Sequence, residues 1–195
     1  MQPKKSVIIE VLGTPEAGKT SLISDLKPEY EKIRKTEIVV ESAEVLPKGF
    51  EKGSMEAHYW MRMNTVKNLL EKQFCSPNTT ILVDRGIVDA LFWEYYLLNV
   101  KKRNAKQFQA NTMFFNNLGI KSPDLVIYLT TTPEEAIRRI GGEGTLVTKD
   151  FVKEFNLCLE EFMKSISTPV LRIDTTKLSK QQVCNYVLKK TKTLI

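Results

Sequence analysis

Residues 7–23, VIIEVLGTPEAGKTSLI, constrain the fold more than any other stretch of this chain. The mostly apolar residues 7–12 predict a buried strand, and the residues from Thr20 onward predict a helix. Gly13 and Gly18 delimit a short loop between them, and Lys19 follows directly. A lysine is rarely buried without a partner, so this lysine at the end of a buried strand points to a bound ligand.

The loop, GTPEAGKT, matches the pattern G-x-x-x-x-G-K-[ST] at every fixed position. Backbone N–H groups of such a loop surround an anion, and the following helix N-terminus adds positive potential. Lys19 would reach the β- and γ-phosphates of ATP, and the Thr20 hydroxyl would bind Mg²⁺. The alternative is a strand, turn and helix with incidental glycines. The candidates for nucleotide binding are Gly13, Thr14, Pro15, Glu16, Ala17, Gly18, Lys19, Thr20 and Ser21.

A second polar site follows another apolar run, TTILVDRG at residues 79–86. Asp84 ends this predicted strand and suits the second acidic position that holds Mg²⁺. Arg85 comes next, at the sheet edge where open α/β folds bind their ligands. The alternative is a surface pair that ends a strand. A GTPase is excluded, because neither VDRG nor VTKD reaches the motif spacing that this class requires.

Five apolar runs recur along the chain and alternate with segments of helical spacing. Their nearly continuous apolar character predicts parallel strands that are buried on both faces. No repeat or linker interrupts them, so we expect one α/β domain over residues 1–195. The predicted strands lie within residues 6–13, 37–41, 79–84, 124–129 and 169–174.

Capping residues mark several predicted helices. Thr132 with Glu135, and Ser179 with Gln182, have the spacing of capping boxes. Ser54 is placed to cap a helix whose apolar stripe would bury Tyr59 in the core. That stripe consists of Met55, Tyr59, Met63, Val66 and Leu70. A further helix from Ala105 is expected to end at Gly119.

Composition narrows the function classes. No apolar run is long enough to cross a bilayer, and residues 1–13 lack a signal-peptide core, so we expect a cytoplasmic protein without a membrane partner. Three scattered cysteines and a single histidine, His58, argue against a disulfide or zinc framework. The net charge of +6 comes without basic clusters interleaved with aromatics, which argues against nucleic acid and suits small anionic ligands.

The pairing of this loop with DRG at residues 84–86 resembles the thymidylate kinase and deoxynucleoside kinase group of P-loop kinases. It looks closest to bacterial P-loop ATPase or kinase-like domains, over residues 7 to about 174. The resemblance implies a three-layer P-loop NTPase fold with a five-stranded parallel sheet in the order 2-3-1-4-5. It also implies an Mg²⁺- and ATP-dependent phosphotransferase that moves the γ-phosphate to a nucleoside or nucleoside monophosphate. An ATPase or nucleotide-binding switch, and a kinase of another small hydroxyl metabolite, remain the alternatives.

The same resemblance implies roles for further residues. Glu41 would face the acceptor and take a proton from its hydroxyl, unless it is only a capping or exposed glutamate. Arg85 would hold Glu41 or the acceptor. Tyr59, Trp60 and Arg62 lie where family members bind the acceptor.

Towards the C-terminus, a small lid at about residues 138–150 would carry Arg138 or Arg139 onto the transferring phosphoryl group. Both arginines are equally compatible with a solvated helix face, and Lys149 is the only further cation in the lid. Asp174 and Thr175 would lie against the adenine. The apolar helix at residues 87–98 is either core or the contact of a homodimer.

Overall fold

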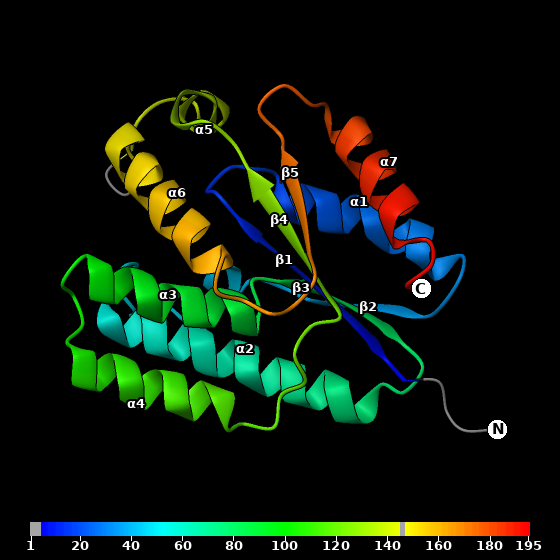
Figure 1. Cartoon of the computed structure of the whole chain (residues 1–195), viewed down its shortest axis with the longest axis horizontal. Coiled ribbons are helices and arrows are strands. Elements are labelled where there is room, and N and C mark those ends of the chain that lie inside the picture. The colour runs from blue at the N-terminus through cyan, green and yellow to red at the C-terminus, as the bar shows by residue number, and fades with distance from the viewer. Residues whose placement is uncertain (1–4, 145–146) are drawn as a thin grey trace.

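The structure is a computed structural model that describes residues 5–144 and 147–195 (Figure 1). The predicted lid includes residues 145 and 146, which lie outside this part of the chain. The strands are β1 (Val7–Gly13), β2 (Thr36–Val39), β3 (Thr80–Asp84), β4 (Leu125–Thr130) and β5 (Val170–Asp174). The helices are α1 (Lys19–Glu31), the 3-10 helix η1 (Ser42–Val45), α2 (Met55–Cys75), α3 (Ile87–Asn99), α4 (Ala105–Asn116), α5 (Pro133–Ile140), α6 (Lys149–Met163) and α7 (Lys180–Thr191).

The five strands form one sheet in the order β2-β3-β1-β4-β5, and every pairing is parallel. This confirms the predicted sheet and its order. Parallel pairing brings the carboxyl ends of all strands to one edge. In the register, Val11 pairs with Asp84 and Gly13 pairs with Leu129. The loop after β1 therefore begins between the ends of β3 and β4.

Helices cover both faces of the sheet, with α1 and α7 on one side and α2, α3, α4 and α6 on the other (Figure 1). Alternating β1 residues feed two apolar clusters: Ile9 and Val11 pack toward α1 and α7, and Ile8 and Leu12 toward the opposite layer. The expectation that every strand is buried on both faces is wrong for β5. Its Val170 is 40% exposed, because β5 is an edge strand.

Two of the predicted caps are confirmed. Ser54 accepts a hydrogen bond from the Ala57 amide, and Ser179 with Gln182 forms a reciprocal capping box. At α5 the cap is one-sided, because the Glu135 carboxylate is held by arginines of its own helix and does not return to Thr132. The helix expected to end at Gly119 ends three residues earlier, at Asn116.

The predicted core face of α2 is also wrong in part. Tyr59 and Met63 are 41% and 42% exposed, whereas Arg62 is 5% exposed. The helix is rotated from the expected stripe because it turns Arg62 inward onto the buried carboxylate of Glu94 on α3. Within the described residues, no helix is long and apolar enough to span a bilayer.

Candidate active site

The loop after β1 curls at the carboxyl edge of the sheet. Gly13 has φ 143, and a Cβ there would lie 1.9 Å from the Leu129 carbonyl oxygen, so only glycine fits against β4. Gly18 is left-handed with φ 91 and stands at the N-cap of α1 without a side-chain cap. The first amides of α1 are therefore free to bind an anion.

Glu16 replaces the glycine that many such loops carry, and the backbone explains why glycine is common there. Its φ is 59, a left-handed conformation that glycine adopts without steric cost. The Glu16 carbonyl accepts a hydrogen bond of 3.0 Å from Nη1 of Arg139. This bond is one of the contacts that hold the loop in its strained form.

Lys19 is folded back into its own loop. Its side chain is almost fully buried, and Nζ donates to the carbonyl oxygens of Thr14 at 2.8 Å and Gly13 at 3.3 Å. Burial, followed by the nearby Arg85, lowers the pKa of Lys19 to about 8, although Glu41 and Asp84 oppose the shift. An anionic ligand in the loop would oppose this shift.

The two predicted Mg²⁺ ligands lie together. The Thr20 hydroxyl donates to Oδ2 of Asp84 at 2.7 Å, and Oδ1 of Asp84 is buried with no hydrogen-bond partner among the described residues. Burial raises the pKa of Asp84 and the Thr20 bond lowers it. A hydroxyl beside an unsatisfied carboxylate oxygen fits a hard cation that takes its remaining ligands from phosphate and water.

Arg85 and Glu41 form an ion pair next to the loop, with Nε of Arg85 2.9 Å from Oε1 of Glu41. Arg85 has φ 59, and its amide donates to the Val11 carbonyl. Glu41 precedes η1 but makes no capping bond with its side chain, which excludes the capping interpretation. Asp89 lies 3.8 Å from Nη1 of Arg85. Burial opposes the charge on Arg85, yet these carboxylates and Asp84 raise its pKa overall.

A cavity of about 810 Å³ opens in front of this pair. Lys19, Thr20, Glu41 and Arg85 are among the residues that line it. The rest includes aromatic side chains: His58, Trp93, Tyr96 and Phe151. His58 packs against Trp93 in a tilted arrangement with ring centroids 5.1 Å apart. Burial, followed by Arg62 and Arg103, lowers the pKa of His58 to about 4. Arg62 lines this cavity, whereas the predicted acceptor-site residues Tyr59 and Trp60 do not.

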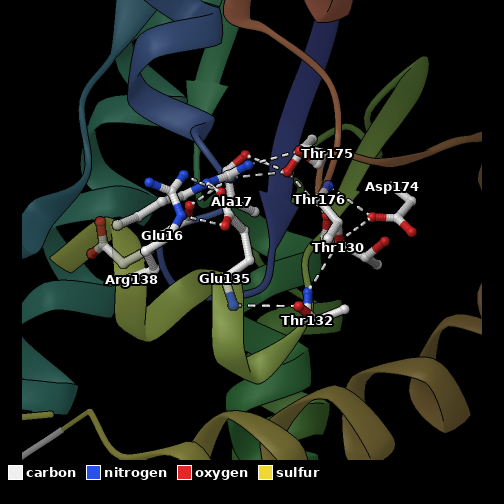
Figure 2. Close-up of polar contacts among 10 residues, drawn as sticks. Glu16, Ala17, Thr130, Thr132, Glu135, Arg138, Asp174, Thr175 and Thr176 are labelled. Carbon is white, nitrogen blue, oxygen red and sulfur yellow. Dashed lines mark hydrogen bonds and ion pairs between the residues drawn. The ribbon is translucent and has the colours of Figure 1, made fainter. Parts of the chain in front are cut away.

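A second cavity, of about 650 Å³, lies on the other side of the loop, between α5, α7 and the segment after β5. Thr175 lines it, and the Thr175 hydroxyl donates to the Ala17 carbonyl. The Asp174 carboxylate instead accepts hydrogen bonds from the amide and hydroxyl of Thr176 (Figure 2). Of the two residues predicted to contact adenine, the structure brings only Thr175 to this cavity.

The two lid arginines lie in different surroundings. The side chain of Arg138 is 73% exposed. It pairs with Glu135 of the same helix (Figure 2). Arg139 donates to Glu135, to the Glu16 carbonyl, and to both oxygens of Thr175. Arg139 therefore joins α5 to the loop after β1 and to the segment after β5. A role for Arg139 on the transferring phosphoryl group stays a prediction that requires these bonds to break.

Sequence reasoning missed a buried polar network beside the larger cavity. Glu94 is fully buried and accepts hydrogen bonds from Arg62, Arg103 and Asn111. The guanidinium of Arg103 also lies 4.6 Å from the centre of the Tyr59 ring. The signal was Glu94 itself, one of two acidic residues in the otherwise apolar stretch IVDALFWEYYLL. Its partners come from α2, α4 and the α3–α4 connection, so the sequence pattern of α3 does not identify them.

The sheet order, the covering helices and the loop after β1 define the P-loop kinase fold. The chain is similar to a solved deoxyadenosine kinase from M. mycoides with products dCMP and dCDP bound, at a TM-score of 0.76 and 21% identity. The match covers 96% of this chain and 100% of that one. The M. mycoides enzyme with bound dATP gives a TM-score of 0.72 and 23% identity, over 95% and 99% of the two chains.

The thymidylate kinase of Candida albicans matches at a TM-score of 0.71 and 18% identity, over 97% of this chain and 92% of that chain. No protein-family model matches the sequence, and no curated protein sequence matches it either. At these sequence identities the similarity establishes the fold. At the level of the fold, it confirms the resemblance to the deoxynucleoside and thymidylate kinase group.

Proposed function

We propose that this protein is an Mg²⁺- and ATP-dependent phosphotransferase that transfers the γ-phosphate to a nucleoside or nucleoside monophosphate. One observation carries the proposal: a single cavity is lined by residues of the phosphate loop, by Thr20, which bonds Asp84, and by the Glu41–Arg85 pair. A phosphate loop alone would serve any nucleotide-binding protein. A carboxylate and a guanidinium next to it are the groups that transfer to a hydroxyl requires.

In this proposal the amides of the loop and the first turn of α1 bind the phosphates of ATP. Lys19 leaves the carbonyl oxygens of Gly13 and Thr14 and turns to the β- and γ-phosphates. Thr20 and Asp84 hold Mg²⁺, which neutralises phosphate charge when bound. These residues act mainly by positioning and by offsetting charge.

Glu41 is the proposed base. Its carboxylate takes the proton of the acceptor hydroxyl as the hydroxyl oxygen bonds to the γ-phosphorus and the bond from that phosphorus to the leaving ADP oxygen breaks. Arg85 orients Glu41 through their ion pair and offsets charge on the transferring group. Arg138 is the proposed lid arginine, because its exposed side chain is free to turn once it releases Glu135.

The aromatic lining supports a planar acceptor. Trp93 and Tyr96 meet edge to face with centroids 5.5 Å apart, and Phe151 packs on Tyr96. Flat walls of this kind suit a nucleobase, with its sugar hydroxyl directed to Glu41. The smaller cavity would take the adenine of ATP against Thr175. We place this activity in the cytoplasm, without a nucleic acid or membrane partner, and leave a homodimer open.

A nucleotide-hydrolysing switch is the second candidate. One observation favours it: of the two lid arginines, Arg139 is committed to structural contacts and Arg138 alone is exposed. Such a protein would release ADP slowly without any acceptor. A kinase of another small hydroxyl compound would differ only in the occupant of the larger cavity.

One assay separates these functions. The protein is incubated with Mg-ATP and with nucleosides, nucleoside monophosphates and other hydroxyl metabolites, each in turn, and ADP release is measured. Acceptor-dependent ADP release with phosphorylated acceptor detected by mass spectrometry supports the kinase. Slow ADP release that no acceptor changes supports the switch and overturns the kinase proposal.

A further inference from the structure

A carboxylate lies in the middle of the central strand. Glu10 of β1 is 1% exposed, and it lies between the apolar residues Ile9 and Val11. Strand alternation directs it to the same face as Ile8 and Leu12, toward α3. A buried carboxylate is unfavourable unless hydrogen bonds replace the water that it loses.

Three backbone amides supply those bonds. Oε1 of Glu10 accepts from Gly86 at 2.9 Å and from Asp89 at 2.8 Å, and Oε2 accepts from Val88 at 3.1 Å. These amides begin α3, whose N-cap, Gly86, provides no capping side chain. Glu10 therefore caps α3 from a different strand and places its charge at the positive end of that helix.

The same contacts hold the turn that carries Arg85. Val11 fixes this turn through its carbonyl, which accepts the Arg85 amide at 3.1 Å, while its neighbour Glu10 fixes the amides that follow. Arg85 has the strained φ of 59, a conformation that persists only when surrounding contacts impose it. A Cβ at Gly86 would lie 2.6 Å from Oε2 of Glu10, so position 86 requires glycine for this approach.

We infer that Glu10 is a positioning residue of the phosphate-transfer site: its carboxylate sets the turn at residues 85–89 and thereby directs Arg85 and Asp89 toward the acceptor cavity. This inference rests on the proposed kinase function and extends it to a residue that touches neither substrate. Burial raises the pKa of Glu10 to about 7, and its bonds with Asp89, Val88 and Gly86 oppose the rise. Assays at pH 8 therefore examine the ionised carboxylate.

Glu10→Gln tests the inference with little change in volume. The amide oxygen can keep the bonds from Gly86 and Asp89, but the amide nitrogen then faces the Val88 N–H, donor against donor. We expect kcat for acceptor-dependent ADP release to fall at least tenfold, with Kd for ATP unchanged within about threefold, because the phosphate loop is intact. Ile8→Ala is the matched control, since it loosens the same face of β1 without touching the turn.

A double-variant comparison separates positioning from a general loss of structure. If Glu10 acts through Arg85, then Glu10→Gln changes kcat less than twofold in an Arg85→Ala background. An equal loss in both backgrounds, or full activity of Glu10→Gln alone, overturns the inference. Gly86→Ala provides a second variant if Glu10→Gln does not fold, because its Cβ displaces the carboxylate and should lower kcat in the same way.

Amide hydrogen exchange tests the contact between Glu10 and the turn separately from the proposed function. In Glu10→Gln the amides of residues 86–89 should exchange at least tenfold faster than in the wild-type protein, and in Ile8→Ala they should not. If the wild-type protein transfers phosphate to no acceptor, the proposed function fails and the inferred role in transfer fails with it. A rise in exchange confined to residues 86–89 would then still establish Glu10 as the residue that holds this turn, and unchanged exchange overturns that contact as well.

Discussion

Nε of Arg85 lies 2.9 Å from Oε1 of Glu41, although the two residues are 44 positions apart and come from the ends of different strands. Arg85 directly follows β3, and Glu41 lies two residues beyond β2. Because β2 and β3 are parallel neighbours, their carboxyl ends meet. This pair places a partly exposed carboxylate beside the phosphate loop.

Replacing Glu41 by Gln should suppress phosphate transfer and leave ATP binding unchanged. A glutamine cannot accept the hydroxyl proton, and loss of a general base costs about 100- to 10,000-fold in rate. Transfer is measured by steady-state kinetics and ATP binding by calorimetry. Glu44→Gln, an exposed change within η1, is the control. Full transfer activity in Glu41→Gln would show that another group takes the proton.

Replacing Lys19 by Ala should weaken nucleotide binding by about 30- to 150-fold, the loss expected for a charge-assisted hydrogen bond of about 2–3 kcal/mol. The free energy of unfolding should not fall by more than about 1 kcal/mol, because burial already disfavours the charge on Lys19. Titration with a fluorescent nucleotide measures the first effect and urea unfolding the second. Lys27→Ala, on the exposed side of α1, should alter neither. Unchanged nucleotide binding would remove the proposed site.

Gly13→Ala should destabilise the fold by about 2–4 kcal/mol, since its Cβ would overlap the Leu129 carbonyl at 1.9 Å and its φ of 143 disfavours alanine. Gly144→Ala is the control, because a Cβ there meets no heavy atom within 4 Å, and we expect a change of at most about 0.5 kcal/mol. Thermal or urea unfolding measures both. Equal stability of the two variants would mean that the loop does not approach β4 so closely.

His58 should make stability depend on pH. Its pKa is about 4 in the folded protein and about 6.5 when unfolded, so the unfolded chain binds more protons between these values. The full difference corresponds to about 3 kcal/mol, and because His58 is only partly buried, solvent screening reduces it. The free energy of unfolding therefore falls as the pH drops from 6.5 to 4, by on the order of 1–2 kcal/mol from this group. His58→Phe keeps a ring against Trp93 and should lack this component.

Urea unfolding of both proteins at several pH values measures the His58 contribution as the difference between their two curves. Carboxylates such as Glu37, whose pKa is lowered to about 2 by Lys35 and Lys72, titrate in both proteins and cancel. Parallel curves for wild type and His58→Phe would contradict the prediction.

The sheet could be predicted from the sequence because each strand is a local apolar run, and the phosphate loop because its spacing is local. The same holds for Asp84, at the end of such a run. Strand ends were predicted less accurately. The second strand was expected to reach Glu41, but β2 ends at Val39 and Glu41 lies beyond it. The resemblance predicted the contact between Glu41 and Arg85. The distance between the two side chains and their other partners could be obtained only from the folded structure.

Buried charges are what the sequence did not reveal. Glu10 interrupts an apolar strand and Glu94 an apolar helix, and neither has its stabilising partners nearby in the chain. Hydrophobic periodicity describes which face of an element is apolar, but a buried ion pair places polar side chains on that face. This is why the orientation of α2 was predicted wrongly. Arg139 was assigned by position alone, whereas its four acceptors come from three separate segments.

Glu16, Gly18 and Ser21 line both cavities, so the phosphate loop forms a thin partition with one chamber on each side. A nucleotide that spans this partition, with its base in the smaller cavity, would expose only its terminal phosphate to the larger cavity. In evolution, the residues of one chamber can change to accept a new compound while those of the other chamber stay as they are.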